Sequence, residues 1–337
     1  MLADIIGRKI SRVIGVVLYL FYIILVVFSG NVLFIGLAFI ICGASYAFES
    51  GSGEAMIYDS LLKTNDQENY MKISGNREII YQLSSSMAIL IGGYIALTSY
   101  NLNFFVVFIA FVTALIPILL MKETKTKKVE KDQNIRDLLY EHFILSTKTV
   151  FNDRNLTFLI FIGAFIAAPI TSVFFYFQLY LTDTLLFSPS IIGILLASHS
   201  VAGALGGYFA AQLEKKYQEK LLLYIVPLFI VISFWVIQVD FLIFVPFVLL
   251  GFLDSILYIV LSDYINRIVP SEQRATVISF NSLVFSIVMI FIFPLLGYIG
   301  QSTGFKFSFL ILAILVSLLY LMLLYILNKT EFKLEKD

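Results

Sequence analysis

Two ionisable side chains lie deep inside apolar stretches of this sequence, where a charge is costly and usually serves a function. Asp254 follows Phe241, the start of one apolar run, by 13 residues, which is about 20 Å along a helix. Its carboxyl group must be protonated, hydrated or paired across helices. His199 lies nine residues after Ser190 in another run, and its imidazole titrates near neutral pH. Either side chain could carry a proton, although a hydrogen bond to a neighbouring helix explains His199 equally well.

Three further acidic residues, Glu49, Glu54 and Asp59, lie at or just beyond the end of the apolar run 32–53. Counted from Asn31, Glu49 lies about 27 Å along the helix and Glu54 about 35 Å, whereas the hydrocarbon core is about 30 Å thick. Glu54 and Asp59 are therefore expected at the membrane surface, either as functional groups or as hydrated carboxylates that balance Arg8, Lys9 and Lys63. Glu49 lies at the boundary, and we treat it as a candidate coupling residue together with Asp254 and His199.

The composition indicates an integral membrane protein. The chain is 60% hydrophobic and 14% charged, with a mean hydropathy of +0.93. A single cysteine, Cys42, excludes an intrachain disulfide and is best explained as a small buried residue. The sequence contains no nucleotide-binding loop, metal-ligand cluster or hydrolytic triad. We therefore expect no enzyme, no cofactor, no metal and no nucleic-acid partner.

Ten apolar runs are long enough to cross a bilayer as helices. They lie near residues 12–29, 32–53, 78–98, 102–121, 156–181, 190–212, 220–238, 241–264, 275–299 and 305–327. An even number places both termini on one side. If that side is the cytoplasm, every Lys and Arg except Lys306 is cytoplasmic, as the positive-inside rule requires. We therefore expect a multi-pass protein of the cell membrane with both termini in the cytoplasm.

One long, charged segment interrupts these runs. Residues 122–155 separate four expected helices in residues 1–121 from six in residues 156–337. We predict three parts: an N-terminal helical domain, a cytoplasmic central loop, and a C-terminal helical domain with a short cytoplasmic tail.

The opening residues match a known loop motif, G-x-L-a-D-r-x-G-r-k. Leu2, Ala3, Asp4, Gly7, Arg8 and Lys9 fall on its positions. Two positions depart from it: Ile5 replaces a basic residue, and the motif's opening Gly would lie one residue before Met1. This stretch resembles the loop between helices 2 and 3 of the major facilitator superfamily. The resemblance implies an all-α bundle of two six-helix halves, working by alternating access. Four helices in the first part would then mean that helices 1 and 2 are lacking. From this we expect an upstream extension of roughly 50 to 70 codons, or else a chain that does not transport.

The resemblance also implies a cytoplasmic gate. Asp4 should lie at the N-terminus of the family's helix 11, which corresponds to the run 275–299, near Arg274, where backbone N–H groups favour an anion. Arg8 should reach Asp59 at the end of the family's helix 4, which corresponds to the run 32–53. Together with Gly7 and Lys9, these residues would latch the outward-facing state.

Helix 7 of the family lines the central cavity, and three polar residues on the corresponding run are candidates for that role: Tyr176, Gln178 and Tyr180. Tyr176 and Tyr180 share one helix face and offer rings and hydroxyls to an amphipathic molecule. The alternative is that they belong to an aromatic belt at the membrane interface.

The function implied by the resemblance is secondary transport of a small amphipathic molecule by a monomer, most simply proton-coupled efflux. A helix-5 signature of drug/proton antiporters is partly kept in residues 84–93, but Ile89 replaces its proline. Nutrient uptake by the same fold, and a truncated membrane protein without transport, remain alternatives.

Overall fold

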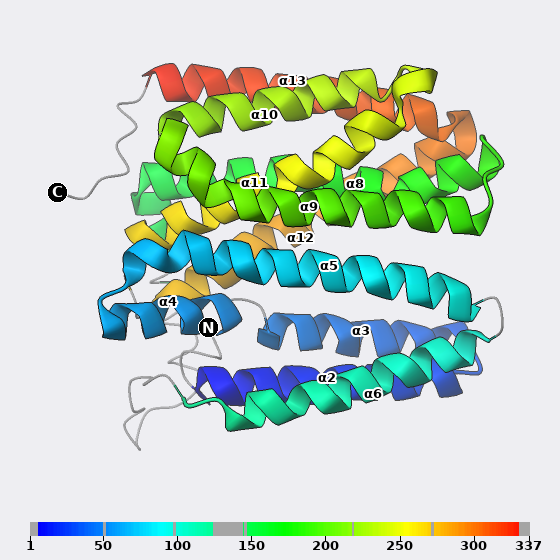
Figure 1. The fold of residues 1–337 in the computed structure, drawn as a ribbon, viewed down its shortest axis with the longest axis horizontal. Coiled ribbons are helices and arrows are strands. Elements are labelled where there is room, and N and C mark those ends of the chain that lie inside the picture. The colour runs from blue at the N-terminus through cyan, green and yellow to red at the C-terminus, as the bar shows by residue number, and fades with distance from the viewer. Residues whose placement is uncertain are drawn as a thin grey trace. The chain divides into compact units, whose positions relative to one another are not determined.

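The computed structural model describes residues 6–49, 52–96, 99–123, 144, 147–217, 219–270 and 273–329. Every regular element in these ranges is a helix, as the apolar runs and the family resemblance predicted (Figure 1). The helices are α2 Arg8–Phe28, α3 Val32–Glu49, α4 Ser52–Thr64, η1 Gln67–Asn69, α5 Tyr70–Ala96, α6 Tyr100–Leu120, α8 Arg154–Asp183, α9 Pro189–Tyr217, α10 Glu219–Val236, η2 Asp240–Leu242, α11 Phe244–Ile268, α12 Arg274–Thr303 and α13 Phe305–Lys329.

Eight of the described helices are long and apolar enough to cross a membrane. These are α2, α3, α6, α8, α9, α11, α12 and α13. The two predicted runs outside this set are also helical. In α10 the apolar part is the shorter stretch Leu221–Val236, and α5 carries charged and amide side chains, among them Arg77, Glu78 and Gln82. The predicted count of ten spans, and the predicted lack of two preceding helices, therefore stay predictions.

The chain forms two compact units. The first contains Met1–Gln67, Ile95–Asp153 and Val269–Ser282, and the second contains Glu68–Tyr94, Arg154–Ile268 and Leu283–Asp337. Their membership differs from the predicted halves at two helices. Nearly all of α5 belongs with the later helices, and the first turns of α12 belong with the earlier ones.

In the first unit, α2 packs against both α3 and α6, and the three helices run alongside one another (Figure 1). Gly15 lets α2 approach α3 closely, because a Cβ there would lie 3.2 Å from the Ser45 carbonyl oxygen. The Ser45 hydroxyl donates to the Gly15 carbonyl at 2.8 Å. The Ser11 hydroxyl donates to the Phe48 carbonyl at 2.7 Å one turn closer to the start of α2. Inside a membrane the hydrophobic effect does not drive helices together, so close packing at small residues and interhelical hydrogen bonds hold these helices in contact.

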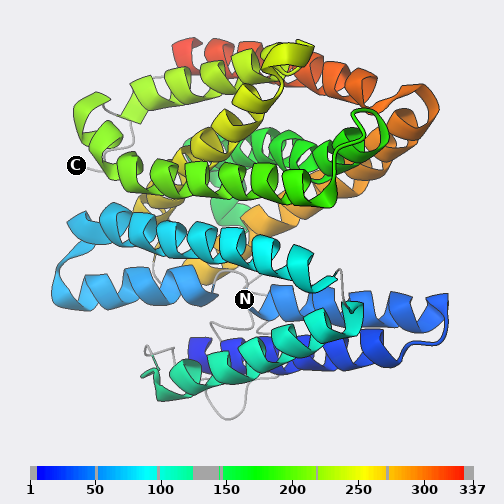
Figure 2. The ribbon, with the colours of Figure 1, turned by 45° about the vertical axis from the view of Figure 1, so that its right-hand side comes forward.

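In the second unit, α9 and α11 form the most extensive helix pair, and α10 lies beside α13 (Figure 2). Two glycines permit the close crossing of α9 and α11. A Cβ at Gly206 would collide with the Phe252 carbonyl, and one at Gly251 would collide with the backbone of His199. Helix α5 approaches α9 in the same way, because a Cβ at Gly75 would lie 2.5 Å from the Gly207 carbonyl oxygen.

Candidate functional site

A single carboxylate in the first unit binds two arginines that are distant in sequence. Arg8 forms an ion pair with Oδ2 of Asp59, and Nη1 of Arg274 donates to Oδ1 at 2.7 Å. Both arginine side chains are 4% exposed, and the Asp59 side chain is 12% exposed. We call these three residues the Asp59 cluster.

The second arginine of the cluster has further contacts that fix its plane. Nη2 of Arg274 donates to the Val269 carbonyl at 2.9 Å, and the guanidinium carbon lies 4.0 Å from the ring centroid of Tyr58. A guanidinium stacks favourably on an aromatic face, more strongly when water is excluded. The contact that the motif implied between Arg8 and Asp59 is therefore present, with Tyr58 and Arg274 completing a buried charge network.

Local structure at the start of α2 directs Arg8 toward the cluster. Gly7 is the residue before the helix and has φ +105°, a conformation that favours glycine. The backbone N–H groups of Arg8 and Lys9 donate to the carboxylate of Glu123, at 2.9 and 3.1 Å. Asp4 lies outside the described residues, so its expected position beside Arg274 stays a prediction.

Glu49 ends α3 and binds Arg12. Nε of Arg12 donates to Oε1 of Glu49 at 2.9 Å, and 43% of the Glu49 side chain is exposed. This carboxylate therefore has a cationic partner and lies at a helix end. That environment does not favour Glu49 over Asp254 as a coupling residue.

Asp254 is half-buried in α11 of the second unit, and the next residue, Ser255, binds Glu78 of α5. Glu78 is buried, and its Oε1 accepts hydrogen bonds from Nε2 of Gln82 at 2.7 Å and from the Ser255 hydroxyl at 3.2 Å. No ion pair of either carboxylate with a basic side chain is found within the described ranges. The sequence analysis missed Glu78, although it opens the apolar run 78–98 and could have been found by the criterion that identified Asp254.

His199 is buried in α9 and bound to α11. Its Nδ1 lies 2.8 Å from the Phe247 carbonyl oxygen, so Nδ1 carries the proton and donates it. The imidazole also contacts the rings of Phe174 and Phe247, with centroids 5.0 and 4.8 Å away. This geometry matches the structural explanation of His199 given above.

The candidate cavity residues lie on α8. The Tyr176 hydroxyl donates to the Phe293 carbonyl of α12 at 2.7 Å, and its ring stacks on Phe293. Tyr180 is 3% exposed and contacts the ring of Phe309 of α13. Gln178 is half-exposed. Both tyrosines thus pack between helices, and the geometry gives their predicted role in a cavity no support.

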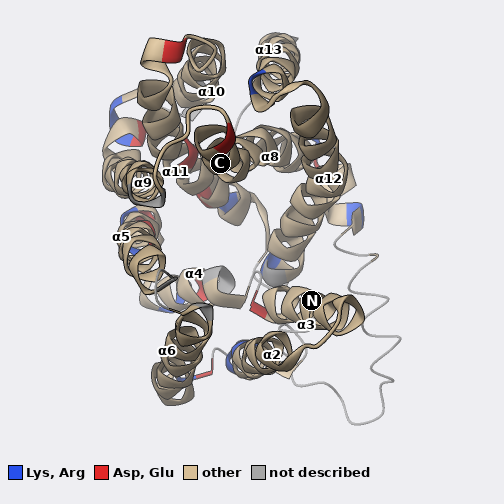
Figure 3. Cartoon of the chain, turned by 90° about the vertical axis from the view of Figure 1, so that its right-hand side faces the viewer, with Lys and Arg blue, Asp and Glu red and all other residues tan. Residues whose placement is uncertain are grey.

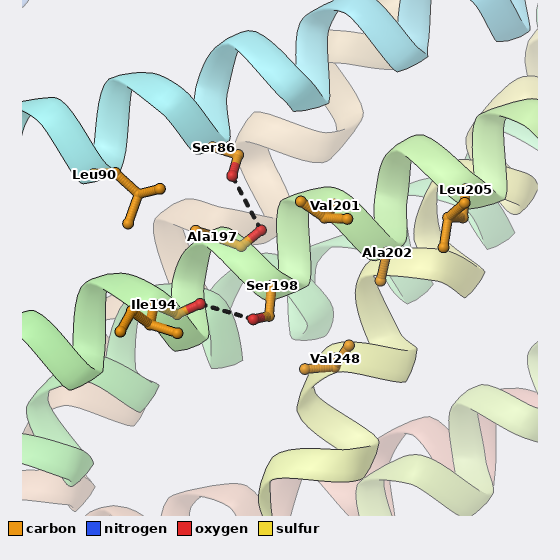
Figure 4. A pocket seen from close by; sticks show the side chains of 9 residues that line it. All are labelled: Ser86, Leu90, Ile194, Ala197, Ser198, Val201, Ala202, Leu205 and Val248. Atoms are coloured by element: carbon orange, nitrogen blue, oxygen red, sulfur yellow. Dashed lines mark hydrogen bonds between the residues drawn. The ribbon is translucent and has the colours of Figure 1, made fainter.

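A wide apolar groove of about 370 Å³ lies between α5, α9 and α11 (Figure 4). Its lining residues are Ser86, Leu90, Ile194, Ala197, Ser198, Val201, Ala202, Leu205 and Val248. Both serine hydroxyls donate to backbone carbonyls, those of Ala197 and Ile194, at 3.3 and 2.8 Å. Most residues of the described helices are neither acidic nor basic (Figure 3). The groove therefore presents apolar surface without an unsatisfied hydroxyl.

The profile described as Major Facilitator Superfamily matches residues 1–239 and 160–337. A search among curated protein sequences finds no match. The human organic anion transporter MFSD10 (TETRAN) is similar in structure, with a TM-score of 0.77 and 14% identity over 95% of this chain and 78% of that one.

Two bacterial structures are also similar. A bacterial homologue of the iron transporter ferroportin, in the outward-facing state, has a TM-score of 0.71 and 16% identity over 96% of this chain and 84% of that one. The E. coli fucose:proton symporter FucP has a TM-score of 0.63 and 12% identity over 94% and 83%. At these identities the likeness concerns the fold.

Proposed function

Because this chain belongs to the major facilitator superfamily, we propose that it is a secondary transporter that exports a small amphipathic molecule in exchange for protons. The membrane-spanning helices and the absence of nucleotide-binding and hydrolytic motifs from the sequence support transport driven by an ion gradient.

The observation that carries this proposal is the Asp59 cluster. Asp59 and Arg8 come from the first helices, whereas Arg274 stands at the start of α12. An ion-pair cluster between segments 215 residues apart can break and re-form as helices move. We propose that it acts as the cytoplasmic gate: it is intact in one state of the transport cycle and broken in the other.

Asp254 is the proposed coupling residue. An ionised carboxylate inside a membrane costs several kcal/mol unless it is paired or hydrated, and within the described ranges no basic side chain forms an ion pair with Asp254. Proton binding at Asp254 would remove this cost, and proton release would restore it. His199 is the weaker candidate, because its ring is fixed by Phe247.

The experiment is transport by the purified chain in proteoliposomes with an imposed pH gradient. Ethidium serves as the amphipathic probe, and a pH dye trapped inside reports proton movement. We expect ethidium and protons to move in opposite directions. Asp254→Asn should abolish the dependence on the pH gradient while folding stays near normal, because an amide fills the same space without titrating. His199→Gln, the comparison variant, should have a smaller effect.

Wild-type pH dependence in Asp254→Asn would exclude Asp254 as the coupling residue. Movement of ethidium and protons in the same direction would favour the second candidate, proton-coupled uptake. That candidate has support in the fold, which the chain shares with a fucose:proton symporter. Absence of any gradient-driven flux for ethidium and for a fucose probe would contradict both forms of the proposal.

A further inference from the structure

The start of α2 and the end of α6 bind each other through reciprocal contacts. Oε1 of Glu123 accepts from the N–H of Arg8 at 2.9 Å, and Oε2 accepts from the N–H of Lys9 at 3.1 Å. In the other direction, Nζ of Lys9 donates to the Leu119 carbonyl at 2.6 Å. The first N–H groups and last carbonyls of a helix lack partners within the helix. An acidic side chain at one end and a basic one at the other satisfy both groups and suit the helix dipole.

Gly7 leaves space for this cap. A Cβ at Gly7 would lie 2.7 Å from Oε2 of Glu123 and 3.1 Å from its carboxylate carbon. Gly7 has no side chain that could cap α2. Glu123, which is distant in sequence, takes the place of a local capping residue. Two features thus require glycine at position 7: its φ of +105° and the close approach of the Glu123 carboxylate.

Arg8 takes part in both the helix cap and the Asp59 cluster. The backbone N–H of Arg8 is held by Glu123, and its guanidinium pairs with Asp59. We propose that Glu123 is a positioning residue of the gate: by capping α2 it holds the Arg8 guanidinium on Asp59. This inference rests on the proposed role of the Asp59 cluster as the gate. Glu123 would then set how often the gate opens without touching a transported molecule.

The test measures the gate directly in the purified full chain. The only cysteine, Cys42, is replaced by Ser, and nitroxides are attached at the exposed positions Thr64 and Asn152 for pulsed distance measurement. Thr64 ends α4, which carries Asp59, and Asn152 lies near Thr149, whose hydroxyl contacts Gln273 at 2.5 Å, next to Arg274. Glu123→Ala should raise the ratio of the gate-open to the gate-closed distance about two- to fivefold, the range expected for loss of an exposed carboxylate at a helix N-terminus.

Three comparisons make the result specific. Glu123→Gln, which keeps an acceptor oxygen, should have a smaller effect than Glu123→Ala. Glu68→Ala removes an exposed carboxylate in η1 and should leave the ratio unchanged. In an Arg8→Ala background, Glu123→Ala should add nothing, because Glu123 acts through Arg8.

An unchanged ratio in Glu123→Ala, or an undiminished effect without Arg8, would overturn the inference. The distance measurement needs no substrate, so its failure is separable from failure of the proposed function. A shifted ratio in a chain that carries no flux would leave the positioning role intact and remove the transport proposal.

Discussion

At the scale of single residues, the family resemblance correctly predicted one contact of a motif residue. Arg8 and Asp59 form the expected ion pair. The motif says nothing about Glu123, which lies 115 residues after Arg8 and reaches it only because α6 returns beside α2. It also does not state that Arg274 binds the same carboxylate. Contacts between distant segments depend on helix packing, and single-sequence patterns do not contain that information.

The Asp59 cluster makes a residue-scale prediction about stability. Asp59→Asn removes the negative charge and leaves two buried guanidinium groups facing a neutral amide. Breaking a buried ion pair in this way typically costs about 3–5 kcal/mol, so the midpoint of thermal unfolding in detergent should fall by several degrees. Asp240→Asn is the control, because Asp240 pairs with Lys306 at 2.6 Å with 70% and 43% of the two side chains exposed. Such exposed pairs contribute about 0–1 kcal/mol. Equal midpoints for the two variants would contradict the prediction.

At the scale of helices, apolar runs predicted which segments are helical but not how closely they approach. The run at 78–98 belongs to the longer helix α5, which begins at Tyr70. Its Glu78 and Gln82 are tolerated because their polar groups bond to each other and to Ser255 of α11. Tyr176 could be placed on a helix face from its spacing. Its burial against Phe293 could not be predicted, because that depends on which helix lies opposite.

Glycine positions in α9 give the prediction at this scale. Gly206→Ala should destabilise the helix pair, because its Cβ would collide with the Phe252 carbonyl of α11. Overpacking of this kind typically costs about 1–3 kcal/mol. Gly193→Ala lies in the same helix, where a Cβ would meet nothing within 4 Å. It should be neutral or stabilising by up to about 1 kcal/mol, because alanine favours a helix. Thermal unfolding of both variants measures the difference, and a loss of stability in Gly193→Ala alone would refute the packing argument.

At the scale of the whole molecule, composition and charge asymmetry predicted a polytopic membrane protein, and the family match and eight apolar helices agree with it. The division into parts was predicted from the charged segment 122–155, whereas contacts group α5 with the later helices. A long loop marks a break between two groups of helices in the sequence. It does not predict which helices are in contact, since small residues such as Gly75 and Gly207 can bring together helices from either side of a loop.

The orientation of α5 is the decisive feature of the predicted ten-span topology, because this helix has the weakest apolar signal of those expected to cross. If α5 crosses, Asp66 before it and Asn103 after it lie on opposite sides of the membrane. The positive-inside rule assigns Asp66 to the cytoplasm, together with the nearby Lys63 and Lys72.

In a Cys42→Ser chain expressed in intact cells, a membrane-impermeant maleimide should label Asn103→Cys at once. It should label Asp66→Cys only after the cells are permeabilised. Thr184→Cys, in the turn after α8, and Lys216→Cys, in the last turn of α9, are the comparison positions that the predicted topology places outside and inside the cell. Labelling of Asp66→Cys and Asn103→Cys from the same side would show that α5 does not cross and that the orientation of every later helix must be reassigned.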